Sequence, residues 1–350
     1  MRVFSSIGKR VMGLFGSRGV TGIDIGAGSI KIVSIAKGRR RPVLLSAELL
    51  ELPLAPTGSE EAAVGLLLSR KIKGRAIVTQ MPGRDLTIRH VTLPRMPHEE
   101  LREAVRWEAK RFISYPLDAA LVEYLIVGEK LEGTVTKYEV LIIAAPEVRV
   151  RERVTLFNEA GIRVTAVDAN ALALRNVLRL RENQVNENIL VVDFGAGKTE
   201  IDIFKNGNLR FSRNLEIGGV DITRAIAALL KTGPQEAEEL KRKTDLLSPA
   251  EEDRVTALVR NRLGETFGEI RRSIDYYKTT FREQGVERMI LTGGGSLMTG
   301  MKDYCSRFFE VAVELDAPFV ALSARRKLKE QFGPLGSRFS AAVGLALRRG

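Results

Sequence analysis

Residues 189–200 read ILVVDFGAGKTE, and residues 20–31 read VTGIDIGAGSIK. In each stretch a run of β-branched and aliphatic residues, typical of a buried strand, leads to an aspartate, Asp193 or Asp24, and then to a glycine-containing turn. Glycine lets backbone N–H groups approach an anion closely, and a second apolar run follows each turn. The chain therefore carries the same strand–turn–strand hairpin twice, with an acidic residue at each tip.

Two such hairpins suit the binding of one phosphate chain from two sides. Carboxylates are preferred ligands of Mg²⁺, which accompanies nucleotide phosphates. A third turn, Thr292–Ser296, contains three consecutive glycines between a strand-like run and a helical stretch, an order found where a helix start binds phosphate. The sequence predicts a nucleotide between two related lobes.

Two other phosphate-binding motifs are excluded by their context. Residues 195–199 read GAGKT, like the end of a P-loop, but that motif needs a glycine at position 192, where Val192 stands inside a strand. It also needs a helix after the turn, and none is expected. Residues 26–28 lack the third glycine of a dinucleotide-binding fingerprint and enter a strand.

Composition limits the classes of protein to which the chain can belong. Its 350 residues allow two or more domains, and 44% hydrophobic residues allow sizeable cores. The single cysteine, Cys305, excludes an internal disulfide and fits a reducing compartment. No apolar run approaches the roughly 20 residues that span a bilayer. We therefore expect a cytoplasmic protein.

The net charge of +12 raises the question of an anionic partner. Nucleic acid is not expected, because aromatic residues make up only 6% and no recognition motif is present. In residues 1–18 apolar side chains recur at helical spacing among basic ones, which predicts a basic amphipathic segment in peripheral contact with an anionic membrane. The alternative is a tail that packs on its own domain.

The order of expected strands and helices divides the chain into lobes. The first lobe is predicted to comprise residues 19–83 and 146–183, and the second residues 184–350, of which 231–284 form a helical subdomain. Residues 84–145 read strand, helix, strand, strand, and they interrupt the first lobe as an inserted small domain.

The three turns resemble those of the actin-like ATPase superfamily, which includes actin, DnaK-type chaperones, sugar kinases and the bacterial proteins FtsA, MreB and PilM. Residues 24–31 look like the first phosphate loop, residues 193–199 like the second, and residues 291–296 like the adenosine loop. Residues 218–223 (GGVDIT) resemble the element after the second phosphate hairpin, and residues 237–241 (AEELK) the helix that holds the adenosine. The resemblance covers nearly the whole chain and implies an α/β actin-like ATPase fold.

The resemblance also implies ATP and Mg²⁺ as cofactors. Asp24 and Asp193 are then expected to hold Mg²⁺, mostly through water. The other nucleotide-binding residues that the matched motifs imply are Gly26, Gly28, Ser29, Lys31, Gly195, Gly197, Lys198, Thr199, Gly218, Gly219, Glu238, Lys241, Gly293, Gly294, Gly295 and Ser296.

The inserted block, residues 84–145, indicates which member of the superfamily the chain resembles. Its strand–helix–strand–strand order resembles the small domain of FtsA and PilM, and residues 93–113 resemble PilM, the actin-like protein of type IV pilus assembly, more than FtsA. Residues 144–146, 160–162 and 167–174 fit the same family. Trp107 lies on the amphipathic helix expected at 99–112, and we expect it in the core of the small domain.

A PilM-like identity implies a scaffold at the inner face of the cytoplasmic membrane. Such a protein is implied to capture the short cytoplasmic N-terminal peptide of the inner-membrane protein PilN, in a groove between the first lobe and the inserted domain. ATP hydrolysis is expected to be slow or absent, because fast turnover needs a group that orients the attacking water, and the sequence does not display one.

Two other functions stay open on the sequence alone. The first is an FtsA- or MreB-like cytoskeletal or division protein that self-associates on membranes. The second is a small-molecule kinase of the same fold, which needs a catalytic carboxylate against a substrate hydroxyl; no second acidic motif has a clear claim to that task. Sedimentation of polymers with ATP would favour the first, and phosphate transfer to a soluble acceptor the second.

Overall fold

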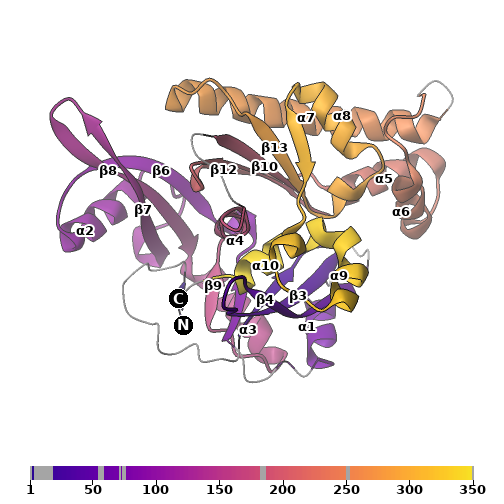
Figure 1. The fold of residues 1–350 in the computed structure, drawn as a ribbon, viewed down its shortest axis with the longest axis horizontal. Helices are drawn as coiled ribbons and strands as arrows, with labels where there is room; N and C mark the ends of the chain where they lie inside the picture. The colour runs from indigo at the N-terminus through magenta and orange to yellow at the C-terminus, as the bar shows by residue number, and fades with distance from the viewer. Residues whose placement is uncertain are drawn as a thin grey trace.

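The computed structural model describes residues 2–3, 19–53, 59–70, 72, 76–181, 187–249 and 253–348. These residues form a mixed α/β fold with three sheets (Figure 1). The first sheet has the order β1 (Arg2–Val3), β9 (Ala166–Asp168), β5 (Ala76–Gln80), β2 (Val20–Ile25), β3 (Ser29–Ala36) and β4 (Val43–Glu51). The second has the order β12 (Asn208–Leu215), β11 (Thr199–Lys205), β10 (Asn188–Phe194), β13 (Arg288–Thr292) and β14 (Ala312–Leu315).

The two larger sheets repeat one arrangement, as the duplicated hairpins predict. In the first, β3 is antiparallel to both β2 and β4, and β5 lies parallel to β2 on the other side. In the second, β11 is antiparallel to β10 and β12, and β13 lies parallel to β10. Because β2 and β10 occupy the same place in their sheets, Asp24 and Asp193 lie at equivalent positions near the strand ends. The predicted actin-like fold with two related lobes is confirmed.

The inserted small domain has its own three-stranded sheet in the order β6 (Thr87–Pro94), β8 (Val135–Pro146) and β7 (Ala120–Glu132). The helix α2 (His98–Ala109) packs on it through Leu101, Val105 and Ala109. Trp107 is 64% exposed, so the expectation of a core tryptophan is wrong. The three buried residues are spaced by four along α2, and Trp107 falls about 200° of helical rotation from Val105, on the opposite face.

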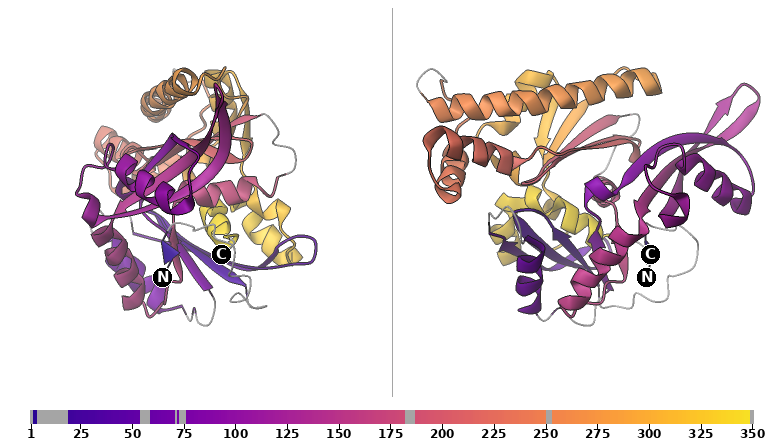
Figure 2. Two further views of the ribbon diagram at one scale, coloured as in Figure 1. Left: turned by 90° about the vertical axis from the view of Figure 1, so that its left-hand side faces the viewer. Right: turned by 180° about the vertical axis from the view of Figure 1, so that it is seen from behind.

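The helices cover the sheets as follows. The helices that surround the first sheet are α1 (Ser59–Leu68), α3 (Glu147–Glu159), α4 (Asn170–Leu178), α9 (Arg326–Phe332) and α10 (Ser340–Ala346). Those of the second lobe are α5 (Gly219–Leu230), α6 (Pro234–Lys243), α7 (Arg254–Phe281) and α8 (Met301–Phe309). Figure 1 shows α4 between the two large sheets, and Figure 2 shows the small domain projecting from one side of the molecule.

The helix α7 is continuous from Arg254 to Phe281, within the helical subdomain predicted for residues 231–284. Asp253 caps its start by accepting hydrogen bonds from the backbone N–H groups of Val255 and Thr256. The helix ends at Arg282, which adopts the left-handed conformation with φ of 56°. Buried residues including Val259, Leu263 and Phe267 form one apolar stripe along it against the second sheet.

The end of the chain differs from the expectation. We expected all of residues 184–350 in the second lobe, but α10 packs on β2 and β3 of the first sheet and against α4. Glycines permit this close approach: a Cβ atom on Gly344 would lie 2.0 Å from the carbonyl oxygen of Ala173, and one on Gly22 would lie 2.2 Å from that of Ala342. The chain therefore returns to the first lobe after β14.

The predicted amphipathic segment at residues 1–18 lies mostly outside the described residues. Its two described residues, Arg2 and Val3, form the strand β1, parallel to β9. A helix therefore does not include these two residues.

Candidate functional site

The two predicted phosphate turns meet between the lobes. A Cβ atom on Gly28 would lie 3.1 Å from the Cβ of Ala196, and one on Gly197 would lie 2.9 Å from the Cβ of Ala27. The β2–β3 and β10–β11 turns are thus in contact at their tips, and residues without a side chain allow that contact.

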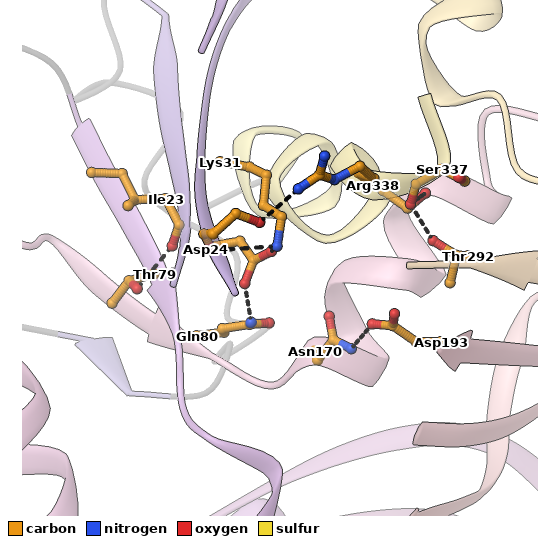
Figure 3. A network of polar contacts seen from close by, with 12 residues as sticks. Ile23, Asp24, Lys31, Thr79, Gln80, Asn170, Asp193, Thr292, Ser337 and Arg338 are labelled. Carbon is orange, nitrogen blue, oxygen red and sulfur yellow. Dashed lines mark hydrogen bonds and ion pairs between the residues drawn. The ribbon is translucent and has the colours of Figure 1, made fainter. Parts of the chain in front are cut away.

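Asp24 is fixed at the end of β2 by neighbours from its own sheet (Figure 3). Its side chain accepts a hydrogen bond of 2.5 Å from Nε2 of Gln80 and forms an ion pair of 3.0 Å with Nζ of Lys31. Gln80 ends β5, the parallel neighbour of β2, so its side chain reaches the same edge of the sheet. Ser29, also buried, accepts a hydrogen bond of 3.2 Å from Nη2 of Arg338.

Asp193 is held on the opposite side by the helix that crosses between the lobes. Its Oδ2 accepts a hydrogen bond of 3.0 Å from Nδ2 of Asn170, the first residue of α4 (Figure 3). The same amide lies 3.2 Å from Oε2 of Glu200, which pairs at 2.7 Å with Lys198. Burial, together with the nearby charges of Glu200 and Asp24, raises the pKa of Asp193 to about 6.

The site offers oxygen atoms suited to hydrated Mg²⁺. Asp24 and Asp193 interact electrostatically across the gap between the lobes. Beside them, the buried amide oxygens of Gln80 and Asn170 have no hydrogen-bond partner in the structure, and buried polar atoms are normally bonded. Carboxylate and amide oxygens with waters are the ligands that Mg²⁺ prefers. No cluster of three or more His, Cys, Asp or Glu side chains suited to a metal occurs among the described residues, so such an ion would need water and phosphate oxygens as well.

The third turn packs directly on the second phosphate turn. Gly293 has a φ of +81°, and a Cβ atom there would lie 2.3 Å from Oδ1 of Asp193. A Cβ atom on Gly295 would lie 2.9 Å from that of Phe194, whereas one on Gly294 would meet no atom within 4 Å. Gly293 and Gly295 therefore fit the turn against Asp193 and Phe194, and Gly294 borders open space.

Several predicted contacts are instead engaged within the protein. The hydroxyl of Thr199 donates to the carbonyl of Ile217 at 2.8 Å, and that of Ser296 donates to the carbonyl of Gly293 at 2.7 Å. Nζ of Lys198 turns towards Glu200 and lies 3.1 Å from Oδ1 of Asn214. In this structure these side chains therefore stabilise the turns through hydrogen bonds within the protein.

The Gly-Gly-x-Asp element places the start of α5 on the second phosphate turn. The N–H groups of Gly219 and Val220 donate to the carbonyls of Gly195 and Ala196 at 3.0 and 2.8 Å. A Cβ atom on Gly218 would lie 2.5 Å from the Ala196 oxygen, so the glycine allows this packing.

Glu238 and Lys241 of α6 come to the same place. Nζ of Lys241 donates to Oε2 of Glu238 at 2.5 Å, to the hydroxyl of Thr223 at 2.8 Å and to the carbonyl of Gly219 at 2.9 Å. The structure thus brings the predicted adenosine helix to the second phosphate turn, with its two polar side chains bound to each other.

Residue-level sequence reasoning missed Gln80, Asn170, Glu200 and Arg338. Gln80 and Asn170 each carry a local signal, because a polar residue follows or ends a buried strand at the edge where the hairpins turn. Arg338 carries no local signal, because its hydrogen-bond partners are far away in sequence. Ser29 lies 309 positions before it and Glu51 lies 287 positions before it.

Comparison with known proteins agrees with the geometry. The sequence matches the family described as type IV pilus assembly protein PilM over residues 22–350. A solved PilM–PilN type IV pilus biogenesis complex superposes with a TM-score of 0.81 and 26% identity, covering 95% of this chain and 98% of the other. MreB5 of Spiroplasma citri bound to AMPPNP superposes with a TM-score of 0.50 at 12% identity, over 94% of this chain and 95% of the other, and shares the fold.

Among curated relatives, the cell division protein FtsA of Bacillus subtilis is 24% identical over 251 residues, which are 63% of this chain and 56% of that protein. The chain thus spans a little more than half the length of this relative. None of the described helices is long and apolar enough to cross a membrane. Because the family match covers nearly the whole sequence, the chain belongs to the PilM family of type IV pilus assembly proteins.

Proposed function

We propose that this protein binds Mg-ATP between its lobes and, in that form, acts at the cytoplasmic face of the inner membrane as a scaffold that captures a peptide of a PilN-like protein. The observation that carries the nucleotide site is the meeting of Asp24 and Asp193, each beside a buried amide oxygen without a partner. The shared fold of an MreB solved with AMPPNP supports the same cleft.

The nucleotide site is tested by Gly294→Asp. The new side chain has room, since no atom lies within 4 Å of its Cβ position, but its charge would repel phosphate oxygens. We expect calorimetry to show Mg-ATP binding at least about a hundredfold weaker, a loss of about 3 kcal/mol in binding free energy. The unfolding midpoint should not change. Gly65→Asp, an exposed glycine of α1 with equally open surroundings, is the matched control. Equal affinity in the two variants would remove Gly294 from the site.

Turnover is expected to be slow. The unpartnered oxygens beside the two aspartates belong to amides, which can orient water but accept a proton poorly, so no efficient general base is present among these groups. We expect phosphate release below about 1 per second, the low end of typical enzymes. A faster rate in the isolated protein would contradict the scaffold function.

The partner proposal rests on family membership and on the groove that the family resemblance implies between the first lobe and the small domain. PilN accompanies PilM in the solved complex that matches this chain. We place this groove where Glu123 of β7 faces the charges of Arg102 and Arg348, and where Nε of Arg348 lies 3.2 Å from Oδ2 of Asp168 at the end of β9. An extended peptide can add to a strand edge in such a groove.

Charge reversal in the groove tests peptide capture. Glu123→Arg places a third cation beside Arg102 and Arg348, so we expect at least about tenfold weaker binding, about 1.4 kcal/mol, of a synthetic peptide from the N-terminus of a PilN-like partner. Mg-ATP affinity should not change. Glu129→Arg makes the same charge change at an exposed position on β7 and is the control. If no such peptide binds to the wild type and ATP induces sedimenting polymers, the FtsA-like alternative is favoured.

A further inference from the structure

The outermost strand of the first sheet is made by the second and third residues of the chain. Arg2 pairs with Ala166 and Val3 with Val167, parallel to β9. Without β1 the sheet would end at β9. All three residues of β9 are buried, so loss of β1 would leave outer backbone N–H and C=O groups of a buried strand without partners.

A second polar feature lies at the end of β9. The side chain of Arg348 is 7% exposed and its Nε lies 3.2 Å from Oδ2 of Asp168, yet neither its Nε nor its Nη1 makes a hydrogen bond. A guanidinium group has only donors, and leaving buried donors unpaired is costly. The strand β9 thus has an outer edge paired only with two residues, and at its end lie buried N–H groups of Arg348 that make no hydrogen bond.

The strand β7 of the small domain brings a carboxylate near Arg348. Burial raises the pKa of Glu123 on β7, while the nearby charges of Arg102 and Arg348 oppose the shift. β7 is the outer strand of its sheet, next to β8 only. Arg348 therefore links the end of β9 to β7, at the place where peptide capture is proposed above.

We propose that β1 is a built-in occupant of the β9 edge, and that the partner peptide binds by replacing it as the strand next to β9. This inference rests on the proposed peptide capture and adds its regulation. A two-residue parallel pairing is weak, but it is intramolecular and acts at a high effective concentration. A longer peptide strand forms more backbone hydrogen bonds and brings carbonyl oxygens that Nη1 of Arg348 can bind. β1 therefore reduces the affinity for the peptide without abolishing binding.

The test compares the wild type with two double variants of the full chain. Arg2→Pro with Val3→Pro removes the backbone N–H groups of β1, whereas Arg2→Ala with Val3→Ala keeps them and removes the side chains. By calorimetry with a synthetic peptide from the N-terminus of a PilN-like protein, we expect the proline variant to bind about three- to tenfold more tightly, as the loss of one or two competing hydrogen bonds implies. The alanine variant should bind like the wild type.

Hydrogen exchange provides the second readout. Amides of residues 166–168 should exchange faster in the proline variant, and the peptide should restore their protection. A peptide with the sequence of residues 1–8, added separately, should compete for the proline variant. Equal peptide affinity in wild type and proline variant, or peptide binding that leaves these amides unprotected, would overturn the inference while peptide capture stands. Absence of peptide binding in every variant would overturn peptide capture itself.

Discussion

Asp193→Asn is expected to stabilise the nucleotide-free protein at pH 7 and to remove Mg²⁺-dependent ATP binding. In the folded chain the pKa of Asp193 is raised from 3.8 to about 6, first by burial and then by Glu200 and Asp24. Because the folded state binds the proton more tightly than the unfolded state, the free energy of unfolding falls as pH rises from about 4 to 6. A shift of this size corresponds to about 3 kcal/mol, and asparagine removes most of it.

The measurement is chemical denaturation without nucleotide at pH 4.5 and pH 7.5. The variant should exceed the wild type in free energy of unfolding by about 2–3 kcal/mol at the higher pH and by only about 1 kcal/mol at the lower. Calorimetry with Mg-ATP should show the opposite order, with binding lost because one of the two carboxylates is gone. Glu48→Gln, an acid-to-amide change on the exposed side of β4, is the control. A variant less stable than the wild type at pH 7.5 would show that Asp193 is not strained by its neighbours.

Gly344→Ala should be among the most destabilising single-methyl changes in the molecule. The added Cβ would lie 2.0 Å from the oxygen and 2.4 Å from the carbon of the Ala173 carbonyl, and both are backbone atoms that cannot turn aside. Relief requires α10 to move away from α4 and β2, which loosens the packing of Val343 and Leu345. Overpacking of this kind costs about 3 kcal/mol.

Gly264→Ala is the matched control, since Gly264 lies inside α7 and a Cβ atom there meets nothing within 4 Å. It should stabilise the protein by up to about 1 kcal/mol through helix propensity. Thermal unfolding of both variants, without nucleotide, makes the comparison. Similar midpoints for the two would mean that α10 is not held tightly against α4.

Local pattern predicted the hairpins well because each carries its own determinants. The runs of β-branched and aliphatic residues within 20–36 and 189–204 specify strands, and the glycines specify the turns between them. The long helix α7 was equally visible, because its apolar residues repeat at helical spacing over its whole length. These features depend on residues close together in sequence.

Other features depend on contacts that no local pattern reveals. An amphipathic helix predicts a core position for Trp107, yet the buried stripe through Leu101 and Val105 excludes that side chain. Arg338 reaches Ser29 across the whole chain, and α10 joins the lobe that begins the sequence. The strand β1 is too short for periodicity to detect, since only two residues pair.

The placement of α10 has a consequence for synthesis of the protein. The strands of the first sheet are complete at residue 168, whereas α10, whose Val343 packs with Val33 in one cluster, begins at residue 340. At ribosomal rates of about 5–20 residues per second, roughly 10–30 s separate the two. During that interval the nascent first lobe exposes the apolar face that α10 will cover, which makes it a substrate for chaperones that bind chains emerging from the ribosome.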